Sequence, residues 1–376
     1  MKITDVRTHV LEAALSQPFA YSRAWYGTRT ASIVEIVTDE GLTGWGECYG
    51  PARLTAAAVE SFRPLLVGAD PLRSDWLWQE IYARFRDHGQ KGVVIEGLSG
   101  VDIALWDIKG KYFNAPVHRL MGGPIRTEVK AYATGLYRRE TGDPEAYLCE
   151  EALDYVRQGF GAVKLKVGFG IEEDARITRA LRRAIGPNVG LMIDANHAYD
   201  SVAAIRLGRM VEDLDIGWFE EPVPPEDLAG YRDVRAALSI PVAGGECEFT
   251  RYGFREVLTS RSIDILQPDT CAAGGLSECK KIADMAAAFG VRYIPHVWGT
   301  GIALAAALQL LAVLPHSPSS LNPTEPMLEF DRTEHPIRQA ILAQPIDHDG
   351  GIVKVPDGPG LGIEIDRTAL ERLRAG

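Results

Sequence analysis

The sequence predicts an α/β protein built around a parallel (β/α)8 barrel of the TIM type, with a smaller α+β module in front of it. A chain of 376 residues can hold one barrel of about 250 residues and a second domain. From about residue 125, short β-rich runs alternate with helical stretches, and acidic residues close three of these runs at equal intervals. The earlier residues show strands followed by helices, which is typical of an α+β module.

The leading module is expected to span residues 1–116. Its N-terminus alternates in polarity like a strand, and the β-rich runs 32–37 and 43–47 flank a Gly-containing turn at 38–41. Helices follow these strands. The clearest of them has an apolar stripe at helical spacing, formed by Leu98, Val101, Leu105, Ile108 and Tyr112.

The barrel is expected to span residues 117–345. Seven helical stretches lie among eight plausible strands, which is close to a closed barrel. The helical candidates are 144–158, 172–185, 203–213, 228–238, 251–260, 276–290 and 301–314. In the tail, residues 346–376, two further strands are predicted at 351–355 and 362–365, so we expect the tail to return to the leading module.

Three acidic residues end apolar runs at equal intervals of 26 residues: Asp194, Glu220 and Glu246. This interval is about the length of one βα unit, so successive parallel strands would carry the three carboxylates to one rim. A single acid at a strand end is as often a helix cap or a solvated loop residue. Three in register predict a site for a divalent cation such as Mg²⁺, which prefers oxygen ligands.

The same rim is expected to hold two lysines, an aspartate and a histidine. Lys164 and Lys166 lie two positions apart in the apolar run 162–167, so both point into the barrel or its mouth. Asp269 and His296 end the next two β-rich runs. A lone histidine is more often packed or exposed than catalytic, but beside a metal triad a catalytic role is favoured.

These groups together predict acid–base chemistry. Repulsion between the two lysines, burial and a nearby cation would each lower a lysine pKa, so that one lysine would act as a base near about pH 8. Asp269 would orient His296 and hold it protonated. A base, an acid and a metal suit removal of a proton α to a carboxylate, because metal and lysine stabilise the resulting enediolate. Metallohydrolysis needs no lysine pair, and a Schiff-base aldolase needs no acid triad.

Composition excludes other classes of protein. The net charge of −11 and the absence of a basic cluster argue against nucleic-acid binding, so an anionic small molecule would be attracted by local cations and a metal. No apolar run approaches the ~18 residues of a membrane span, and we expect a cytoplasmic protein without membrane contact. The five cysteines form no C-x-x-C pair and are expected to be reduced. Cys247 and Cys271, beside the rim, are interpreted as small packed side chains. We also expect a homo-oligomer.

The lysine pair, the acid triad, the Asp269 and His296 pair and the segment 102–111 together resemble the enolase superfamily, in its mandelate racemase subgroup. The resemblance covers nearly the whole chain. It implies a modified (β/α)8 barrel with an α+β capping domain formed by the N-terminal region and the C-terminal tail. It also implies Mg²⁺ as the cofactor and a sugar acid or its lactone as the substrate.

By that resemblance, each candidate has a role. Lys166 is the base, Lys164 supports the substrate carboxylate, Asp194, Glu220 and Glu246 bind Mg²⁺, His296 is the second acid/base held by Asp269, and Asn196 lies near metal and substrate. Glu329 would hydrogen-bond the enediolate, with Glu325 as the alternative in sequence. Glu221 is the alternative to Glu220 if the strand points the other way.

The resemblance also narrows the possible reactions. In the muconate-lactonising and enolase subgroups the sixth barrel strand carries a lysine, and the run 263–269 of this chain has none, which disfavours those two subgroups. Racemisation of a 2-hydroxy acid, dehydration of a sugar acid, and opening of a sugar-acid lactone remain. Four stretches, 131–135, 295–301, 329–333 and 356–364, resemble the galactarolactone cycloisomerases, which implies β-elimination from a hexaro-1,4-lactone to a 3-deoxy-2-keto hexarate.

Residues 18–27 are aromatic and polar and end in glycine. We expect a loop that acts as a lid over the rim, with a surface loop packed on its own domain as the alternative. Its residues Tyr21, Arg23 and Trp25 are candidate substrate contacts, together with Trp298. The stretch departs from what the galactarolactone cycloisomerases would imply, and lids set substrate specificity.

Overall fold

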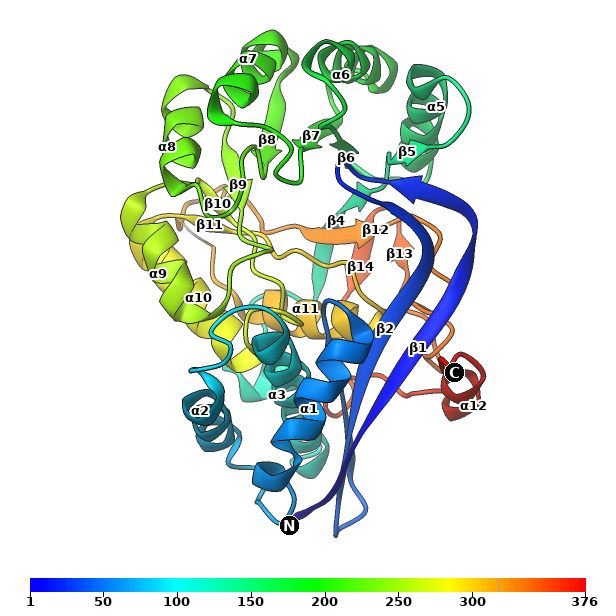
Figure 1. Ribbon diagram of the computed structural model, residues 1–376, viewed down its shortest axis with the longest axis vertical. Coiled ribbons are helices and arrows are strands. Elements are labelled where there is room, and N and C mark those ends of the chain that lie inside the picture. Colours follow the sequence, from blue (N-terminus) through cyan, green and yellow to red (C-terminus); the bar gives the residue numbers. More distant parts are fainter. Residues whose placement is uncertain (317) are drawn as a thin grey trace.

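The computed structural model describes residues 1–316 and 318–376, and it confirms the predicted class (Figure 1). The leading region contains a four-stranded antiparallel sheet in the order β3-β2-β1-β5. Its strands are β1 (Ile3–Ala20), β2 (Trp25–Thr38), β3 (Thr43–Cys48) and the short β5 (Arg138–Arg139). The predicted hairpin of residues 32–37 and 43–47 is therefore present as β2 and β3.

Helices accompany this sheet. They are α1 (Ala52–Leu66), α2 (Ser74–Phe85), α3 (Val93–Tyr112) and the short α4 (Val117–Leu120). Helices α1 and α3 pack on the sheet, α2 packs on α1 and α3, and α4 packs on α3. The apolar stripe predicted within α3 is mostly buried, with Leu98, Val101 and Leu105 in a core shared with β2 and α1. Close approach of α3 to β3 needs a glycine, because a side chain at Gly46 would collide with the backbone of Gly100.

The expectation of a loop at residues 18–27 is wrong, because β1 and β2 continue through most of that stretch. Phe19 pairs with Tyr26 and Ala20 with Trp25, and the rings of Phe19 and Tyr26 lie 5.7 Å apart across the two strands. Cross-strand aromatic pairs stabilise a ribbon, so the aromatic residues that suggested a lid extend the hairpin. Figure 1 shows this ribbon running from the capping helices to the region of β6.

Eight parallel strands form the predicted barrel. Around the ring they follow the order β12-β4-β6-β7-β8-β9-β10-β11. The strands are β4 (Glu128–Thr134), β6 (Ala162–Lys166), β7 (Gly190–Asp194), β8 (Ile216–Glu220), β9 (Val242–Gly244), β10 (Ile265–Leu266), β11 (Arg292–Tyr293) and β12 (Leu328–Asp331).

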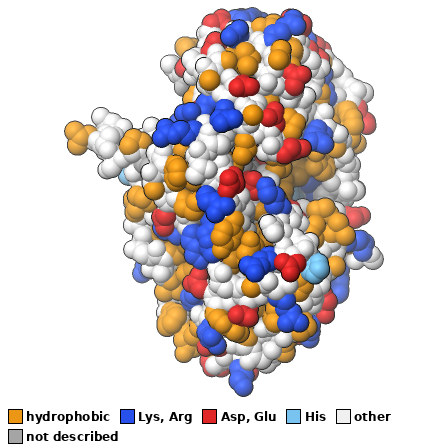
Figure 2. Space-filling model, turned by 60° about the vertical axis from the view of Figure 1, so that its left-hand side comes forward, with side chains coloured by type: hydrophobic (Ala, Val, Ile, Leu, Met, Phe, Trp, Pro, Cys, Tyr) orange, Lys and Arg blue, Asp and Glu red, His pale blue; other side chains and the backbone are white. Residues whose placement is uncertain are grey.

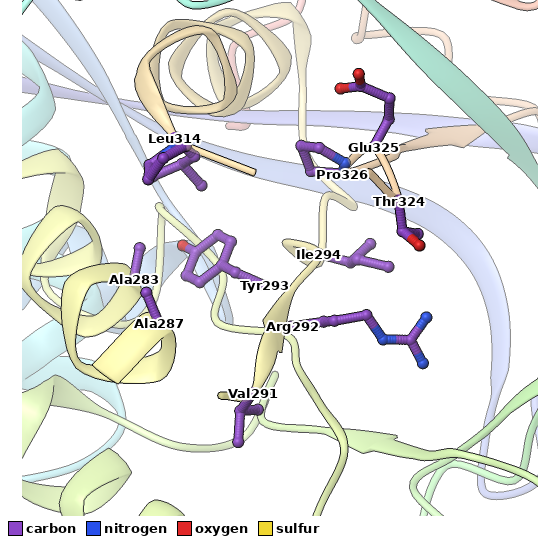
Figure 3. A pocket seen from close by; sticks show the side chains of 11 residues that line it. Ala283, Ala287, Val291, Arg292, Tyr293, Ile294, Leu314, Thr324, Glu325 and Pro326 are labelled. Carbon is purple, nitrogen blue, oxygen red and sulfur yellow. The ribbon is translucent and has the colours of Figure 1, made fainter. Parts of the chain in front are cut away.

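One seam of the ring, between β11 and β12, has no strand pairing within the described residues. Figure 3 shows a pocket at this seam, lined by Arg292 and Tyr293 of β11 and by Thr324, Glu325 and Pro326 of the segment before β12. The barrel is therefore modified, as the resemblance implied.

All seven predicted barrel helices are present, with ends that shift by one or two residues. They are α5 (Pro144–Arg157), α6 (Ile171–Ile185), α7 (Ser201–Val211), α8 (Leu228–Ala237), α9 (Thr250–Ser260), α10 (Gly275–Phe289) and α11 (Gly301–Val313). A 3-10 turn, η1 (Glu212–Leu214), follows α7. Every residue of α11 is buried, as its uniformly apolar sequence requires, and the helix contacts both β3 of the capping sheet and β12 of the barrel.

The tail contains β13 (His348–Asp349) and β14 (Ile352–Lys354), and β14 pairs antiparallel with β4. The strand predicted at 362–365 is wrong: only an isolated bridge joins Ile365 to Leu342, and Gly362 has a φ of 75°, outside the strand region. After α12 (Arg367–Arg372), the chain bonds to β1, since Glu12 N donates to Leu373 O and Ala375 N to Val10 O.

Charged side chains of both signs are interspersed with apolar ones over the face shown in Figure 2. Within the described ranges, no helix has the length and apolar character that a membrane crossing requires. All five cysteines are free, as expected.

Candidate active and metal site

The site is a polar layer on top of an apolar plug inside the barrel. The plug is a buried cluster of inward-facing residues, one from each of several strands: Tyr132, Ala162, Met192, Trp218, Ala243, Ile265 and Ile294. Because side chains alternate along a strand, the residue two positions later also faces inward, one level nearer the carboxyl end. That next level contains Lys164, Asp194, Glu220 and His296, so the strand period itself stacks the polar groups above the plug.

The acid triad comes together as predicted. Oxygen atoms of Asp194, Glu220 and Glu246 all lie within 4.8 Å of one another. Asp194 ends β7, Glu220 ends β8, and Glu246 follows β9 by two residues. Three converging carboxylates, two of them fully buried, are a donor set that fits a hard divalent cation.

Glu220, not Glu221, faces this cluster. The indole Nε1 of Trp218 and the amide Nε2 of Gln267 donate to Glu220 Oε2 at 2.8 and 2.7 Å. Burial raises the pKa of Glu220 to about 7, although Lys164 opposes this shift. The sequence analysis did not identify Gln267. It could have been found because it lies two positions after the plug residue Ile265 and therefore points into the barrel.

Lys164 is fully buried among carboxylates. Its Nζ lies 2.5 Å from Glu220 Oε1 and 2.8 Å from Glu329 Oε1. Burial alone would lower the pKa of Lys164, but Glu220 and Glu329 together raise it well above its usual value. Lys164 is thus a fixed positive charge in this arrangement.

Lys166 lies one level higher, at the mouth, and is 8% exposed. Its Nζ donates to Asp194 Oδ2 and to Asn196 Oδ1, the latter at 3.0 Å. Burial acts to lower the pKa of Lys166, yet Asp194 raises it above the usual range. Without a cation at the triad, the nearby carboxylates outweigh repulsion between the lysines. A lysine that is neutral near pH ~8 therefore stays a prediction for the metal-bound protein.

His296 and Asp269 form the predicted pair. His296 Nδ1 lies 2.7 Å from Asp269 Oδ2, and His296 Nε2 lies 3.5 Å from Glu246 Oε2. Burial disfavours the imidazolium, but Glu246, Glu329 and Asp269 together raise the pKa of His296 to about 10. The ring of Tyr49 packs edge-on against the imidazole, with centroids 5.4 Å apart.

The structure separates Glu329 from Glu325. Glu329, on β12, accepts hydrogen bonds from Thr134 Oγ1 at 2.7 Å and from Val297 N at 2.9 Å, and its pKa is lowered by Lys164 despite burial. Glu325 instead pairs with Arg126 at 3.3 Å and lines the seam pocket of Figure 3. Only Glu329 lies with the other candidate residues.

The tip of the β1–β2 ribbon contacts this rim, although its predicted residues do so unequally. Ser22 Oγ donates to Ala195 O at 2.8 Å, between Asp194 and Asn196. Tyr21 stacks on Tyr26, and Tyr26 packs edge-on against Trp298.

Two predicted ribbon residues are exposed to solvent. Arg23 is exposed, and Trp25 is 50% exposed. The indole Nε1 of Trp298 has no hydrogen-bond partner among the described residues. The sequence analysis did not identify Ser22 and Tyr26 as residues near the rim, because nothing in the sequence indicated that the two strands continue that far.

Comparison with known proteins agrees with this arrangement. Residues 3–122 match the family model of the mandelate racemase / muconate lactonizing enzyme N-terminal domain, and residues 147–369 match that of the enolase C-terminal domain-like family. A D-galactarolactone cycloisomerase from Agrobacterium fabrum is 50% identical over 100% of this chain and 99% of its own. An arabinonate dehydratase from Saccharolobus solfataricus is 37% identical over 99% of both chains.

Solved structures show the same fold. The 3,6-anhydro-D-galactonate cycloisomerase from Zobellia galactanivorans superposes with a TM-score of 0.91 and 44% identity over 100% of both chains. A racemase from Streptomyces coelicolor, solved with bound magnesium, has a TM-score of 0.89 and 29% identity over 99% of this chain and 100% of its own.

Proposed function

This chain belongs to the mandelate racemase / muconate lactonizing enzyme family of the enolase superfamily and is an enzyme of the lyase or isomerase type, and we propose that it opens the ring of a sugar-acid lactone. The substrate would be a hexaro-1,4-lactone of the galactarolactone kind, and the product a 3-deoxy-2-keto hexarate. The 50% identity over the whole chain to a D-galactarolactone cycloisomerase carries this proposal. We also propose a cytoplasmic location, supported by the five free cysteines.

The metal would be held by Asp194, Glu220 and Glu246, whose oxygens converge within 4.8 Å. Bound there, Mg²⁺ supplies the positive charge that stabilises an enediolate. Lys164 adds a second fixed charge on the same side, because its Nζ lies between Glu220 and Glu329. We propose that Lys164 supports the substrate carboxylate and that Glu329 hydrogen-bonds the enediolate, with Asn196 beside them.

Lys166 would take the proton α to the free carboxylate. Its position at the mouth, hydrogen-bonded to Asp194 and Asn196, gives it access to a substrate. When Asp194 binds a cation instead, the ammonium loses its nearest counter-charge, and the pKa of Lys166 falls. The electron pair of the broken C–H bond then forms the enediolate, and β-elimination expels the ring oxygen.

His296 would act after that step. In the metal-free protein Glu246, Glu329 and Asp269 raise the pKa of the imidazole to about 10, which favours its protonated form, and Asp269 fixes its orientation. It would deliver a proton to C3 or assist the leaving oxygen. Because the leaving group is a carboxylate, it departs with little help from an acid, so His296 is not required for its expulsion, and Lys166 alone removes the α-proton.

The alternatives use the same residues on other substrates. An acid-sugar dehydratase is favoured by the 37% identity to an arabinonate dehydratase over nearly the whole of both chains. A 2-hydroxy-acid racemase or epimerase would use Lys166 and His296 as bases on opposite faces of one carbon.

The test is a screen of open-chain sugar mono- and diacids and their 1,4-lactones, each with Mg²⁺, followed by NMR of the products. We expect a hexaro-1,4-lactone to yield a 3-deoxy-2-keto hexarate. Faster turnover of an open-chain acid than of every lactone would favour the dehydratase. Interconversion of epimers without a keto product would favour the racemase.

A further inference from the structure

Each strand end that carries a carboxylate of the inner triad also carries a second potential ligand just beyond it. His197 follows Asp194, Glu221 follows Glu220, and Cys247 follows Glu246. One nitrogen, one carboxylate oxygen and one sulfur from these three residues lie within 4.8 Å of one another. His197, Glu221 and Cys247, which we call the outer trio, therefore repeat the triad with a different donor set.

Turned backbone conformations bring the outer trio together. His197 and Glu221 both have positive φ angles, 64° and 43°, and His197 N donates to Glu221 O at 2.9 Å. The imidazole lies between the other two side chains, with Nδ1 3.2 Å from Glu221 Oε2 and Nε2 3.7 Å from Cys247 Sγ.

Glu221 is the observation that points to a ligand. It is 1% exposed, and its Oε1 has no hydrogen-bond partner among the described residues. Its Oε2 receives a long contact of 3.5 Å from Asn196 Nδ2 and lies 3.2 Å from His197 Nδ1, which makes no hydrogen bond to it. A buried carboxylate normally has a cation or several donors, so an oxygen without either is costly to keep.

We propose that the outer trio is a second cation site, selective for a thiophilic or borderline divalent ion of the Zn²⁺ class over Mg²⁺. Thiolate and imidazole ligands favour Zn²⁺ or Co²⁺, whereas the all-oxygen inner triad favours Mg²⁺. In a tetrahedral zinc site ligand atoms lie roughly 3.3–3.8 Å apart, and the imidazole nitrogens already lie 3.2 Å from Glu221 Oε2 and 3.7 Å from Cys247 Sγ. His197 and Cys247 are partly buried, so the trio borders the solvent-facing side of the rim.

The proposal gives Cys247 a role other than the packed side chain that its sequence neighbours suggested. No basic residue adjoins Cys247 in sequence, but the fold brings His197 Nε2 to within 3.7 Å of its sulfur. Cys271 is fully buried and keeps the packed role.

Cobalt binding tests the second site through its thiolate ligand, independently of turnover. The full chain, stripped of metal and then saturated with Mg²⁺, is titrated with Co²⁺. We expect a thiolate-to-cobalt charge-transfer absorption that saturates at one equivalent and disappears when Zn²⁺ is added in excess. The inner triad has no sulfur and gives no such band.

Four variants assign the band. Cys247→Ser should abolish it, and His197→Asn or Glu221→Gln should weaken Co²⁺ binding at least tenfold. Cys149→Ser, a change at another partly buried cysteine, should leave it unchanged.

Two results would overturn the site and leave the proposed function untouched: no band in the parent protein, or a band that persists in Cys247→Ser. If circular dichroism shows that Cys247→Ser does not fold, the His197 and Glu221 variants decide, and unchanged Co²⁺ affinity in both would overturn the site.

Discussion

Lys164 and Lys166 are separated by a single residue, yet their side chains have different surroundings. Lys164 lies between Glu220 and Glu329 with no exposed surface, whereas Lys166 reaches the mouth beside Asp194. That both face inward followed from the two-residue period of a strand. Their depth could not be predicted, because it depends on the apolar plug beneath them, which several strands build together. The sequence predicted carboxylates on the same rim, but not which of them would contact each lysine, and so not the direction of the two pKa shifts.

Replacing Glu220 tests the inner triad. Glu220→Gln should abolish activity and weaken Mg²⁺ binding at least tenfold, because one of three anionic ligands is lost while the barrel core is unchanged. Isothermal calorimetry measures the affinity, and Glu221→Gln is the matched control, expected to retain Mg²⁺ binding. The reverse pattern, with Mg²⁺ affinity lost only in Glu221→Gln, would move the metal site to Glu221.

Lys166 and His296 can be separated by solvent exchange. In deuterium oxide, Lys166→Ala should lose both turnover and exchange of the α-proton, whereas His296→Asn should retain exchange and lose later steps. NMR of the α-proton reports both. A two-base racemase would instead show exchange of one enantiomer in each variant. Unimpaired turnover by Lys166→Ala would contradict every reaction proposed here.

The pKa of His296 should depend on the metal. NMR titration of the imidazole in metal-free protein should give a pKa of about 10. Mg²⁺ should lower this pKa, because Glu246, which contributes most to the rise, would then bind the cation. A pKa raised in the folded state stabilises the fold below the unfolded value of 6.5, and this contribution is lost as the pH rises through about 10. The free energy of unfolding should therefore fall across that window, and less so in His296→Asn. An unshifted pKa would contradict the pairing.

At the scale of elements, the barrel was the most predictable part. Each βα unit repeats a local pattern, so all seven helices and the strand ends that carry Asp194, Glu220 and His296 could be read along the chain. Errors occurred where neighbouring segments decide the conformation. Most of the stretch 18–27 is extended because Phe19 pairs with Tyr26 and Ala20 with Trp25. Residues 362–365 form only the isolated bridge between Ile365 and Leu342.

The ribbon tip gives a test of specificity. Tyr21→Ala should raise KM or change substrate preference more than it reduces α-proton exchange, because Tyr21 supports Tyr26 and Trp298 above the rim. Trp25→Ala, at a half-exposed position on the same ribbon, should have a smaller effect. Steady-state kinetics on several sugar acids and lactones measures both, and equal losses for every substrate would indicate a purely structural ribbon.

At the scale of the whole molecule, the capping region is tied to the barrel close to the candidate site. Glu47, at the end of β3, is 3% exposed and binds the start of α11: its carboxylate accepts from Thr300 Oγ1 at 2.5 Å, from Thr300 N at 2.9 Å and from Ala303 N at 3.0 Å. Thr300 follows His296 and Trp298 by a few residues. The sequence offered no sign of this contact, since its partners lie about 250 residues apart and only docking of the two parts brings them together.

Glu47→Gln should therefore affect the molecule as a whole. In the variant, the side-chain NH2 group of the glutamine would point at backbone N–H groups that donate to a carboxylate oxygen in the parent protein. A buried donor left without an acceptor costs about 1–3 kcal/mol. We expect the free energy of unfolding, from urea denaturation, to fall by about that amount, with faster hydrogen exchange at Ile302 and Ala303. Glu60→Gln, on an exposed position of α1, is the matched control and should change neither. If Glu47→Gln unfolds at the same urea concentration as the parent protein, the cap is held by its apolar contacts with α11 alone, and the loop that carries His296 does not depend on it.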